Sequence, residues 1–201
     1  MNVPRKVTAI IGSYRAGRII DSAVDEILSA AEECGAEVTR IYLRDRHIEF
    51  CTNCRACTQQ AGIRRGACPL ADDMDAILDQ LELSDAIVLA CPVNFGTVTA
   101  AMKRFMERLV CYACWPWGTA GPRSRNKLHH KRAVIVVSSA APAMMIRLMT
   151  GTVGILKKAA GLLGAKTVGV LTIGLAALQE KQDIAAGARK KARHLGKKLV
   201  S

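Results

Sequence analysis

Five short apolar runs alternate with segments of helical periodicity, and this alternation limits the fold more than any other feature of the chain. The runs cover residues 6–12, 36–43, 86–92, 133–139 and 167–174, and their β-branched content predicts buried strands. The intervening segments predict helices at 19–34, from Asp72 or Asp73 to about 83, at 97–112, ending near 163, and at 176–200. Strands separated by helices indicate an α/β protein with a doubly wound parallel sheet covered on both faces.

The chain is expected to form a single domain over residues 1–201, since it contains no internal repeat, low-complexity segment or linker. Half of the residues are hydrophobic, which is enough for a substantial core. Two stretches interrupt the alternation: a Cys-rich loop at 44–71 and a loop at 113–131 rich in Trp, Pro and basic residues.

The apolar content does not indicate a membrane protein, because no apolar run reaches the roughly 18 residues of a membrane span. The N-terminal stretch has no small-residue cleavage site, so we expect it to be the first strand and not a signal peptide. A cytoplasmic location is therefore predicted, in which the eight cysteines are reduced thiols or metal ligands. Collagen, coiled coils and disulfide-stapled toxins are excluded by composition.

The net charge of +12 is concentrated near the C-terminus, where the last 21 residues hold seven Lys or Arg and one Asp. Such clusters can bind nucleic acid or attract an anionic cofactor or partner. A solvated helix face is favoured over a nucleic-acid site, because no aromatic side chains are interleaved with the charges. A basic binding module without a cofactor is kept as a remote alternative.

The turn after the first predicted strand has the composition of a phosphate-binding loop. It runs from Gly12 to Arg18 and leads into the first helix. Its glycines allow a tight turn, Ser13 supplies a hydroxyl, and Arg15 and Arg18 supply positive charge beside the free N–H groups of a helix N-terminus. The loop matches neither the P-loop pattern nor the dinucleotide fingerprint. An ordinary strand–helix turn is the alternative, and phosphate binding is favoured.

Three segments in the same order resemble one enzyme family. GSYRAGR resembles the family's GSPRxxG loop, the stretch from CTNCRACTQQ to DDMDAIL resembles its CxxCxxC…C…DDM segment, and residues 84–109 resemble its PVYxxxVSAxMKxFxDR segment. The family is that of the NAD(P)H-dependent FMN reductases and iron–sulfur flavoproteins, and the resemblance covers roughly residues 6–110. It implies a flavodoxin-like fold with strand order 2-1-3-4-5, a Cys-rich insertion after strand two, bound FMN, and a homodimer or homotetramer.

The resemblance assigns an FMN site to three loops. The loop after strand one would hold the phosphate, the 92–97 turn would line the isoalloxazine and ribityl groups, and the loop after strand four would contact the ring. The cofactor-binding residues predicted in this way are Ser13, Tyr14, Arg15, Gly17, Arg18, Ile19, Ile20, Pro92, Val93, Asn94, Phe95, Gly96, Thr97, Ser138, Ser139 and Ala140.

The sequence departs from the family pattern at several of these positions. Asn94 stands where the family usually has Tyr, and Tyr14 where it has Pro. Ile19 and Ile20 replace the usual Asn/Thr pair, so backbone N–H groups would have to bind more of the phosphate. The missing aromatic face could come from Phe95, Trp115 or Trp117. Loop packing, or burial at a subunit interface, is the equal alternative for the tryptophans.

Four cysteines have the spacing C-x2-C-x2-C-x10-C: Cys51, Cys54, Cys57 and Cys68. Iron–sulfur flavoproteins place a [4Fe–4S] cluster at such a motif, although their last spacing is usually shorter. A cluster, a zinc ion and free thiols all remain open. Cys111 and Cys114 form a second C-x2-C pair, for which two partly buried thiols are favoured over a redox dithiol.

The resemblance implies an oxidoreductase that passes electrons from NAD(P)H through FMN to a small acceptor such as a quinone, a flavin, a nitro or azo compound, or a metal ion. No catalytic side chain is expected, because the flavin carries the chemistry. The alternative is an electron-transfer protein with FMN and a [4Fe–4S] cluster, served by a ferredoxin-like partner. Lys103, Phe105 and Arg108 follow the family pattern and are predicted to have structural roles in helix packing and a salt bridge.

Overall fold

Five parallel strands form the central sheet of the protein. The computed structural model describes residues 3–62, 64–126 and 130–201, apart from the side chains at 147 and 149. The strands are β1 (Lys6–Ile11), β2 (Glu37–Tyr42), β3 (Ala86–Pro92), β6 (Lys131–Ser138) and β7 (Ala165–Ile173), in the order β2-β1-β3-β6-β7. This arrangement confirms the predicted α/β flavodoxin-like sheet with strand order 2-1-3-4-5.

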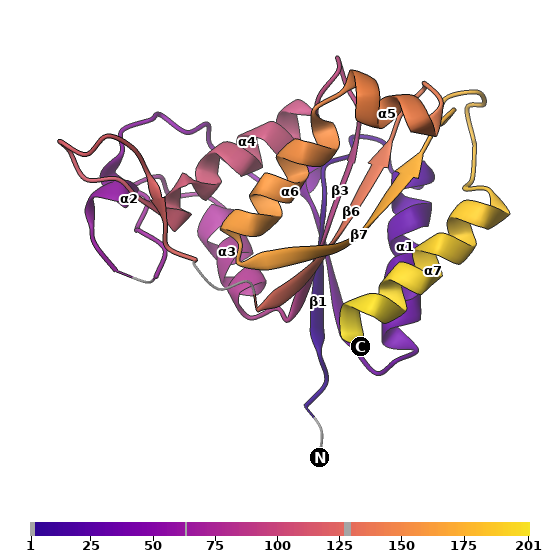
Figure 1. Ribbon diagram of the computed structural model, residues 1–201, viewed down its shortest axis with the longest axis horizontal. Helices are drawn as coiled ribbons and strands as arrows, with labels where there is room; N and C mark the ends of the chain where they lie inside the picture. Colours follow the sequence, from indigo (N-terminus) through magenta and orange to yellow (C-terminus); the bar gives the residue numbers. More distant parts are fainter. Residues whose placement is uncertain (1–2, 63, 127–129) are drawn as a thin grey trace.

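Helices cover both faces of the sheet (Figure 1). One face is covered by α1 (Ile19–Glu32) and α7 (Ala186–Val200), and the other by α3 (Met74–Glu82), α4 (Ala100–Arg108) and α6 (Thr152–Leu162). Alternate residues of β1 enter different cores, since Val7 packs on the α1 and α7 side and Ile10 on the other. Strands buried on both faces explain why the runs in the sequence are continuously apolar.

Several predicted helix boundaries are wrong. The helix predicted at 97–112 is α4 followed by the 3-10 turn η2 (Leu109–Tyr112), and the helix predicted to end near 163 is divided into α5 (Ala143–Met149) and α6. The helix predicted at 176–200 begins only at Ala186. Its first ten residues belong instead to a loop that is held to the end of β6, because Ala176 N–H donates to Ser139 O at 2.9 Å.

The two irregular stretches meet on the α3 and α4 side of the molecule (Figure 1). The first contains the turn η1 (Leu43–Asp45) and the short helix α2 (Ala56–Gln59), and the second contains an unpredicted hairpin of β4 (Ala113–Cys114) and β5 (Arg123–Ser124). Trp115 N–H donates to Thr58 O at 2.8 Å, and Gly66 N–H to Cys111 O at 2.9 Å. We call residues 51–68 and 111–125 together the cysteine-rich module. Residues 127–129 of the predicted loop lie outside the described residues.

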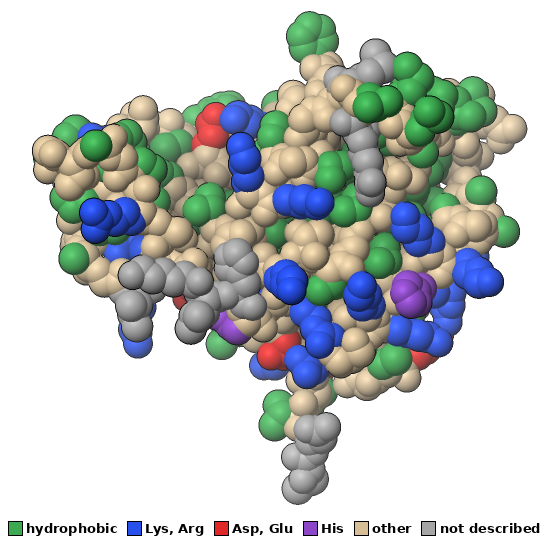
Figure 2. All heavy atoms as spheres, in the orientation of Figure 1, with side chains coloured by type: hydrophobic (Ala, Val, Ile, Leu, Met, Phe, Trp, Pro, Cys, Tyr) green, Lys and Arg blue, Asp and Glu red, His purple; other side chains and the backbone are tan. Residues whose placement is uncertain are grey.

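Part of the C-terminal positive charge holds α7 against α1. Arg189 pairs with Glu26, and Arg193 bonds both carboxylate oxygens of Glu33 at 2.6 and 2.7 Å. Lys and Arg side chains also gather on the surface of this side of the molecule (Figure 2). Two arginines of the basic segment are thus engaged in ion pairs between the helices. No helix in the described part of the chain is long and apolar enough to cross a membrane.

Candidate cofactor site

A cavity of about 270 Å³ lies at the carboxyl edge of the sheet, where the loops after β1, β3, β6 and β7 converge. Doubly wound sheets bind their ligands at this edge. Twelve of the sixteen predicted cofactor residues line the cavity: Ser13, Tyr14, Arg15, Arg18, Ile19, Ile20, Pro92, Val93, Asn94, Ser138, Ser139 and Ala140. The fold therefore brings together predicted residues that lie up to 127 positions apart in the chain.

The lining includes five residues that the sequence analysis missed. They come from the loop after β7 and are Ala176, Ala177, Gln179, Glu180 and Gln182. This segment was assigned to the C-terminal helix, which concealed its place at the cavity. The rule that ligands bind beyond the carboxyl ends of parallel strands was the one signal that pointed to it.

Two arginines make the β1 end of the cavity positive. Arg18 is the N-cap residue of α1, has an extended backbone and makes no side-chain capping bond. Arg15 Nη2 donates to Glu180 O at 3.2 Å, which links the loop after β1 to the loop after β7. Ser13 Oγ accepts a bond from Arg15 N–H at 3.2 Å and so stabilises the turn. The first-turn N–H groups of α1 and these side chains suit an anionic group.

The loop after β1 is fixed to the N-terminus of α4 at two points. Thr99 Oγ1 donates to Gly12 O at 2.6 Å and also accepts the Met102 N–H at 3.2 Å as the N-cap of α4. Tyr14 Oη accepts the Ala101 N–H at 2.9 Å. These bonds hold the loop after β1 against the segment that follows β3. A proline at position 14 has no hydroxyl and could not accept the Ala101 N–H.

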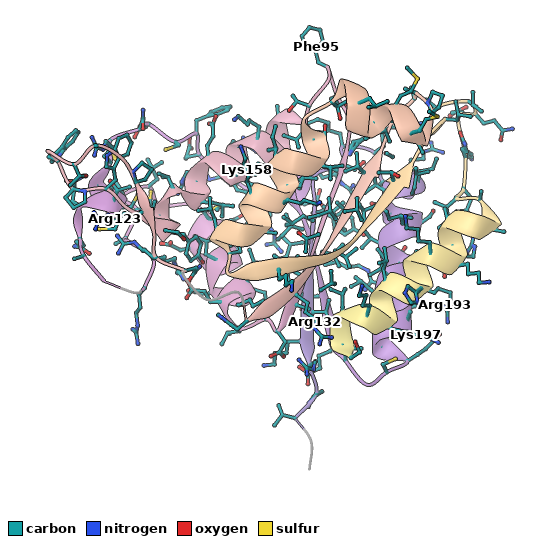
Figure 3. The ribbon with its side chains drawn as sticks, in the orientation of Figure 1. Phe95, Arg123, Arg132, Lys158, Arg193 and Lys197 are labelled. Atoms are coloured by element: carbon teal, nitrogen blue, oxygen red, sulfur yellow. The ribbon has the colours of Figure 1, made fainter. Side chains whose placement is uncertain are left out.

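The turn after β3 is a tight hairpin that directs Phe95 away from the cavity. Asn94 and Thr97 exchange backbone bonds of 2.9 and 3.0 Å, while Phe95 and Gly96 have φ values of 47° and 77°. Two successive positive φ values are typical of a type I′ turn. Phe95 is fully exposed at the tip and points outward (Figure 3). Phe95, Gly96 and Thr97, and also Gly17, are not among the described residues that line the cavity.

The tryptophans do not supply an aromatic face to the cavity either. Trp115 and Trp117 lie in the cysteine-rich module, where their rings enclose Arg55 with its Cζ 3.9 Å from each centroid. This stacking on Arg55 accords with loop packing, while Trp117 stays exposed. Tyr14 is the one aromatic residue among the described lining residues.

A second, much smaller cavity of about 20 Å³ lies in the cysteine-rich module and is lined by Cys51, Cys54, Cys57 and Cys68. Mutual repulsion between these thiols adds to burial in raising the pKa of Cys57. Within the described residues, no group of three or more His, Cys, Asp or Glu side chains has the geometry of a metal site. The cavity has room for about one water molecule, so the donor set fits an iron–sulfur centre but the present spacing does not.

Buried arginines surround the four thiols. Arg108 donates to Asp72 and, through Nη2, to Cys68 Sγ at 3.4 Å. Arg125 donates to the backbone carbonyls of Cys57 and Gln60 at 3.2 and 2.7 Å. The Arg108–Asp72 ion pair confirms the structural role predicted for Arg108.

The remaining cysteines are unpaired, since all eight cysteines of the chain are free thiols. Cys111 is buried and Cys114 partly buried, as favoured by the sequence. Burial raises the pKa of Cys111 to about 12, so this thiol is not a ready nucleophile. Cys91 is fully buried in the core, and Thr99 N–H donates to its Sγ at 3.3 Å.

Curated relatives match about half of the chain. It is 36% identical over 115 residues to an iron–sulfur flavoprotein of Archaeoglobus fulgidus, a match that covers 55% of this chain and 48% of that protein. It is 38% identical over 103 residues to an iron–sulfur flavoprotein of Methanocaldococcus jannaschii, which covers 51% of each. The chain thus spans about half the length of the curated relatives that it matches.

Solved structures with the same fold match nearly the whole chain. An FMN-dependent NADH-azoreductase of Bacillus anthracis in complex with FMN has a TM-score of 0.72 at 13% identity and covers 98% of this chain and 100% of its own. An NAD(P)H:quinone oxidoreductase of Methanothermobacter marburgensis has a TM-score of 0.69 at 16% identity and covers 98% of both. The sequence model of the NADPH-dependent FMN reductases matches residues 5–176. The chain therefore belongs to the NADPH-dependent FMN reductase family.

Proposed function

We propose that this chain binds FMN in the carboxyl-edge cavity and is an oxidoreductase that moves electrons from NAD(P)H to a small acceptor. The observation that carries the proposal is the single cavity in which a positively charged strand–helix loop meets the loops after three other strands. When bound, FMN supplies the chemistry of accepting a hydride and passing electrons on. A quinone, a flavin, a nitro or azo compound and a metal ion are the acceptor classes that we propose.

The two ends of the cavity would bind different parts of FMN. Arg15, Arg18 and the first-turn N–H groups of α1 would hold the phosphate. Pro92, Val93 and Asn94 on one side, with Ser138, Ser139 and Ala140 on the other, would position the ring. The loop at 176–182 would cover the cavity from the β7 side and exclude water. None of these side chains has to transfer a proton, so their contribution is orientation and electrostatics.

The test is a titration of the full-length protein, freed of flavin, with FMN, followed by addition of NADH or NADPH without oxygen. We expect quenching of flavin fluorescence on binding and loss of the paired visible flavin bands on reduction. A protein that binds no FMN, or whose bound FMN neither nucleotide reduces, would contradict the proposal.

A second candidate function is electron transfer through FMN and a [4Fe–4S] cluster. The convergence of four thiols on one small cavity favours it, and two relatives carry the name iron–sulfur flavoprotein. Cys51, Cys54, Cys57 and Cys68, which line that cavity, would be the ligands. A ferredoxin-like protein is the partner that we propose for this function.

Assays of iron, zinc and acid-labile sulfide on anaerobically purified protein show whether these four thiols hold a cluster, a zinc ion or no metal. For a cluster, we expect iron and sulfide in the wild type, their loss in Cys68→Ser, and their retention in the control Cys34→Ser, whose thiol is exposed on the other side of the sheet. Zinc without sulfide would assign a zinc site. A metal-free wild type would leave the simple reductase as the function.

We also propose that the protein is a cytoplasmic homodimer or homotetramer. The eight free thiols support a reducing compartment. Exposed apolar side chains near the carboxyl edge, Phe95, Met144 and Leu148, support self-association.

A further inference from the structure

A buried carboxylate lies directly behind the loop proposed to hold the FMN phosphate. Asp21 is the third residue of α1 and is only 6% exposed. Its Oδ2 accepts the N–H of Gly17 at 2.6 Å. Its Oδ1 is buried and has no hydrogen-bond partner in the described part of the chain. A buried oxygen without a partner is uncommon in native proteins and requires an explanation.

No neighbouring cation neutralises this carboxylate through an ion pair within the described residues. The guanidinium of Arg44 is the nearest positive influence, but its Nη1 donates to Ser13 O at 3.4 Å and its Nε lies 3.6 Å from Asp45. Asp25, one turn farther along α1, adds a second negative charge and pairs with Arg40. Burial is the main reason that the pKa of Asp21 is raised above its ordinary value. Tyr42, whose pKa Asp21 helps to raise, is the other titratable group facing it.

A phosphate bound by this loop competes with Asp21 in two ways. The carboxylate already occupies the Gly17 N–H, one of the backbone donors that an anion in the loop would use. A phosphate dianion beside a poorly solvated carboxylate is also repelled, because like charges interact strongly where water is scarce. The effect is large here because apolar Ile19 and Ile20 add no side-chain donors, and Arg15 is partly engaged with Glu180 O.

We propose that Asp21 is a specificity-determining residue that weakens the grip of the loop on the flavin phosphate. The inference rests on the proposed function, since it assumes that FMN occupies the cavity. Its consequence is a smaller preference for FMN over riboflavin than the same loop would have without this carboxylate. A purely structural role for Asp21, as a cap on the first turn of α1, would leave that discrimination unchanged.

The experiment compares FMN with riboflavin, which has the same ring without the phosphate. Flavin-free full-length wild type, Asp21→Asn and Asp25→Asn are titrated with each flavin by fluorescence quenching. Asn at 21 keeps an acceptor for the Gly17 N–H and removes the charge. We expect the Kd for FMN to fall by about tenfold in Asp21→Asn, as the Coulomb term predicts, with the Kd for riboflavin unchanged. Asp25→Asn, which removes an exposed charge from the same helix, is expected to leave both values within about twofold.

Equal changes for the two flavins, or weaker FMN binding in Asp21→Asn, would overturn the inference while leaving the proposed function intact. Failure of the wild type to bind either flavin would instead overturn the proposed function itself. If Asp21→Asn does not fold, Asp21→Ser supplies the same loss of charge with an acceptor retained.

Discussion

At the scale of single residues, the charge on Arg15 is the most direct test of the phosphate end of the cavity. Arg15 lines the cavity, and its side chain is held towards Glu180 by one bond of 3.2 Å. Replacement by Ala would remove a charge-assisted hydrogen bond to the phosphate, which is worth about 1.5–3 kcal/mol, or a roughly 10- to 150-fold increase in the Kd for FMN. Flavin fluorescence titration measures the change. Riboflavin serves as the control, since its affinity has no phosphate component to lose, and an unchanged Kd for FMN would remove Arg15 from the site.

At the scale of secondary-structure elements, the contact between α1 and α7 depends on a glycine. A Cβ at Gly196 would lie 2.1 Å from Ile27 O and 3.0 Å from Ala30 Cβ. Gly196→Ala would force the helices apart, so we expect unfolding to become easier by about 1–3 kcal/mol. Gly187→Ala is the matched control in the same helix, since a Cβ there meets nothing within 4 Å, and should stabilise by up to about 1 kcal/mol. Urea unfolding measures both variants, and equal midpoints would show that the helix pair tolerates the methyl group.

At the scale of the whole molecule, the Arg108–Asp72 pair joins the cysteine-rich insertion to the helical layer and makes stability depend on pH. Their side chains are only 2% and 1% exposed. Burial alone would raise the pKa of Asp72, but hydrogen bonds from Arg108 and from the N–H groups of Glu49 and Met74 bring the pKa below its ordinary value. A lowered folded-state pKa stabilises the protein above the unfolded value of about 3.9, and this contribution is lost as the pH falls through the folded-state pKa.

Asp72→Asn is therefore expected to unfold about 3–5 kcal/mol more easily at neutral pH, because it leaves a buried guanidinium without its counter-ion. Its free energy of unfolding should also fall less steeply than that of the wild type below about pH 4. Chemical denaturation at a series of pH values measures both effects. Parallel pH profiles for the two proteins would show that another carboxylate is responsible for the acid sensitivity.

The sequence predictions were accurate for elements that local interactions shape. They were less accurate for elements that depend on contacts between distant segments. β3 was predicted at its observed residues, since a seven-residue apolar run that ends in a proline favours a strand buried on both faces. The division between α5 and α6 was missed; it lies at Thr150, whose backbone is extended (φ −134°, ψ 144°). The hairpin of β4 and β5 was missed because each strand has only two residues, too few for any periodicity.

By itself, the sequence determined the parallel sheet and the loop that follows β1, because apolar periodicity and a glycine-bounded turn are local properties of the chain; the strand order was implied by the family resemblance. Only the tertiary structure decided which residues complete the cavity, where the tryptophans lie and how near the four thiols approach one another. Those features depend on contacts between distant segments, such as Tyr14 with Ala101 and Arg15 with Glu180. In the sequence, Asp21 is simply one residue of the first predicted helix. Only the tertiary structure shows that its carboxylate is buried and bonded to Gly17 N–H, from which we infer that it repels a bound phosphate.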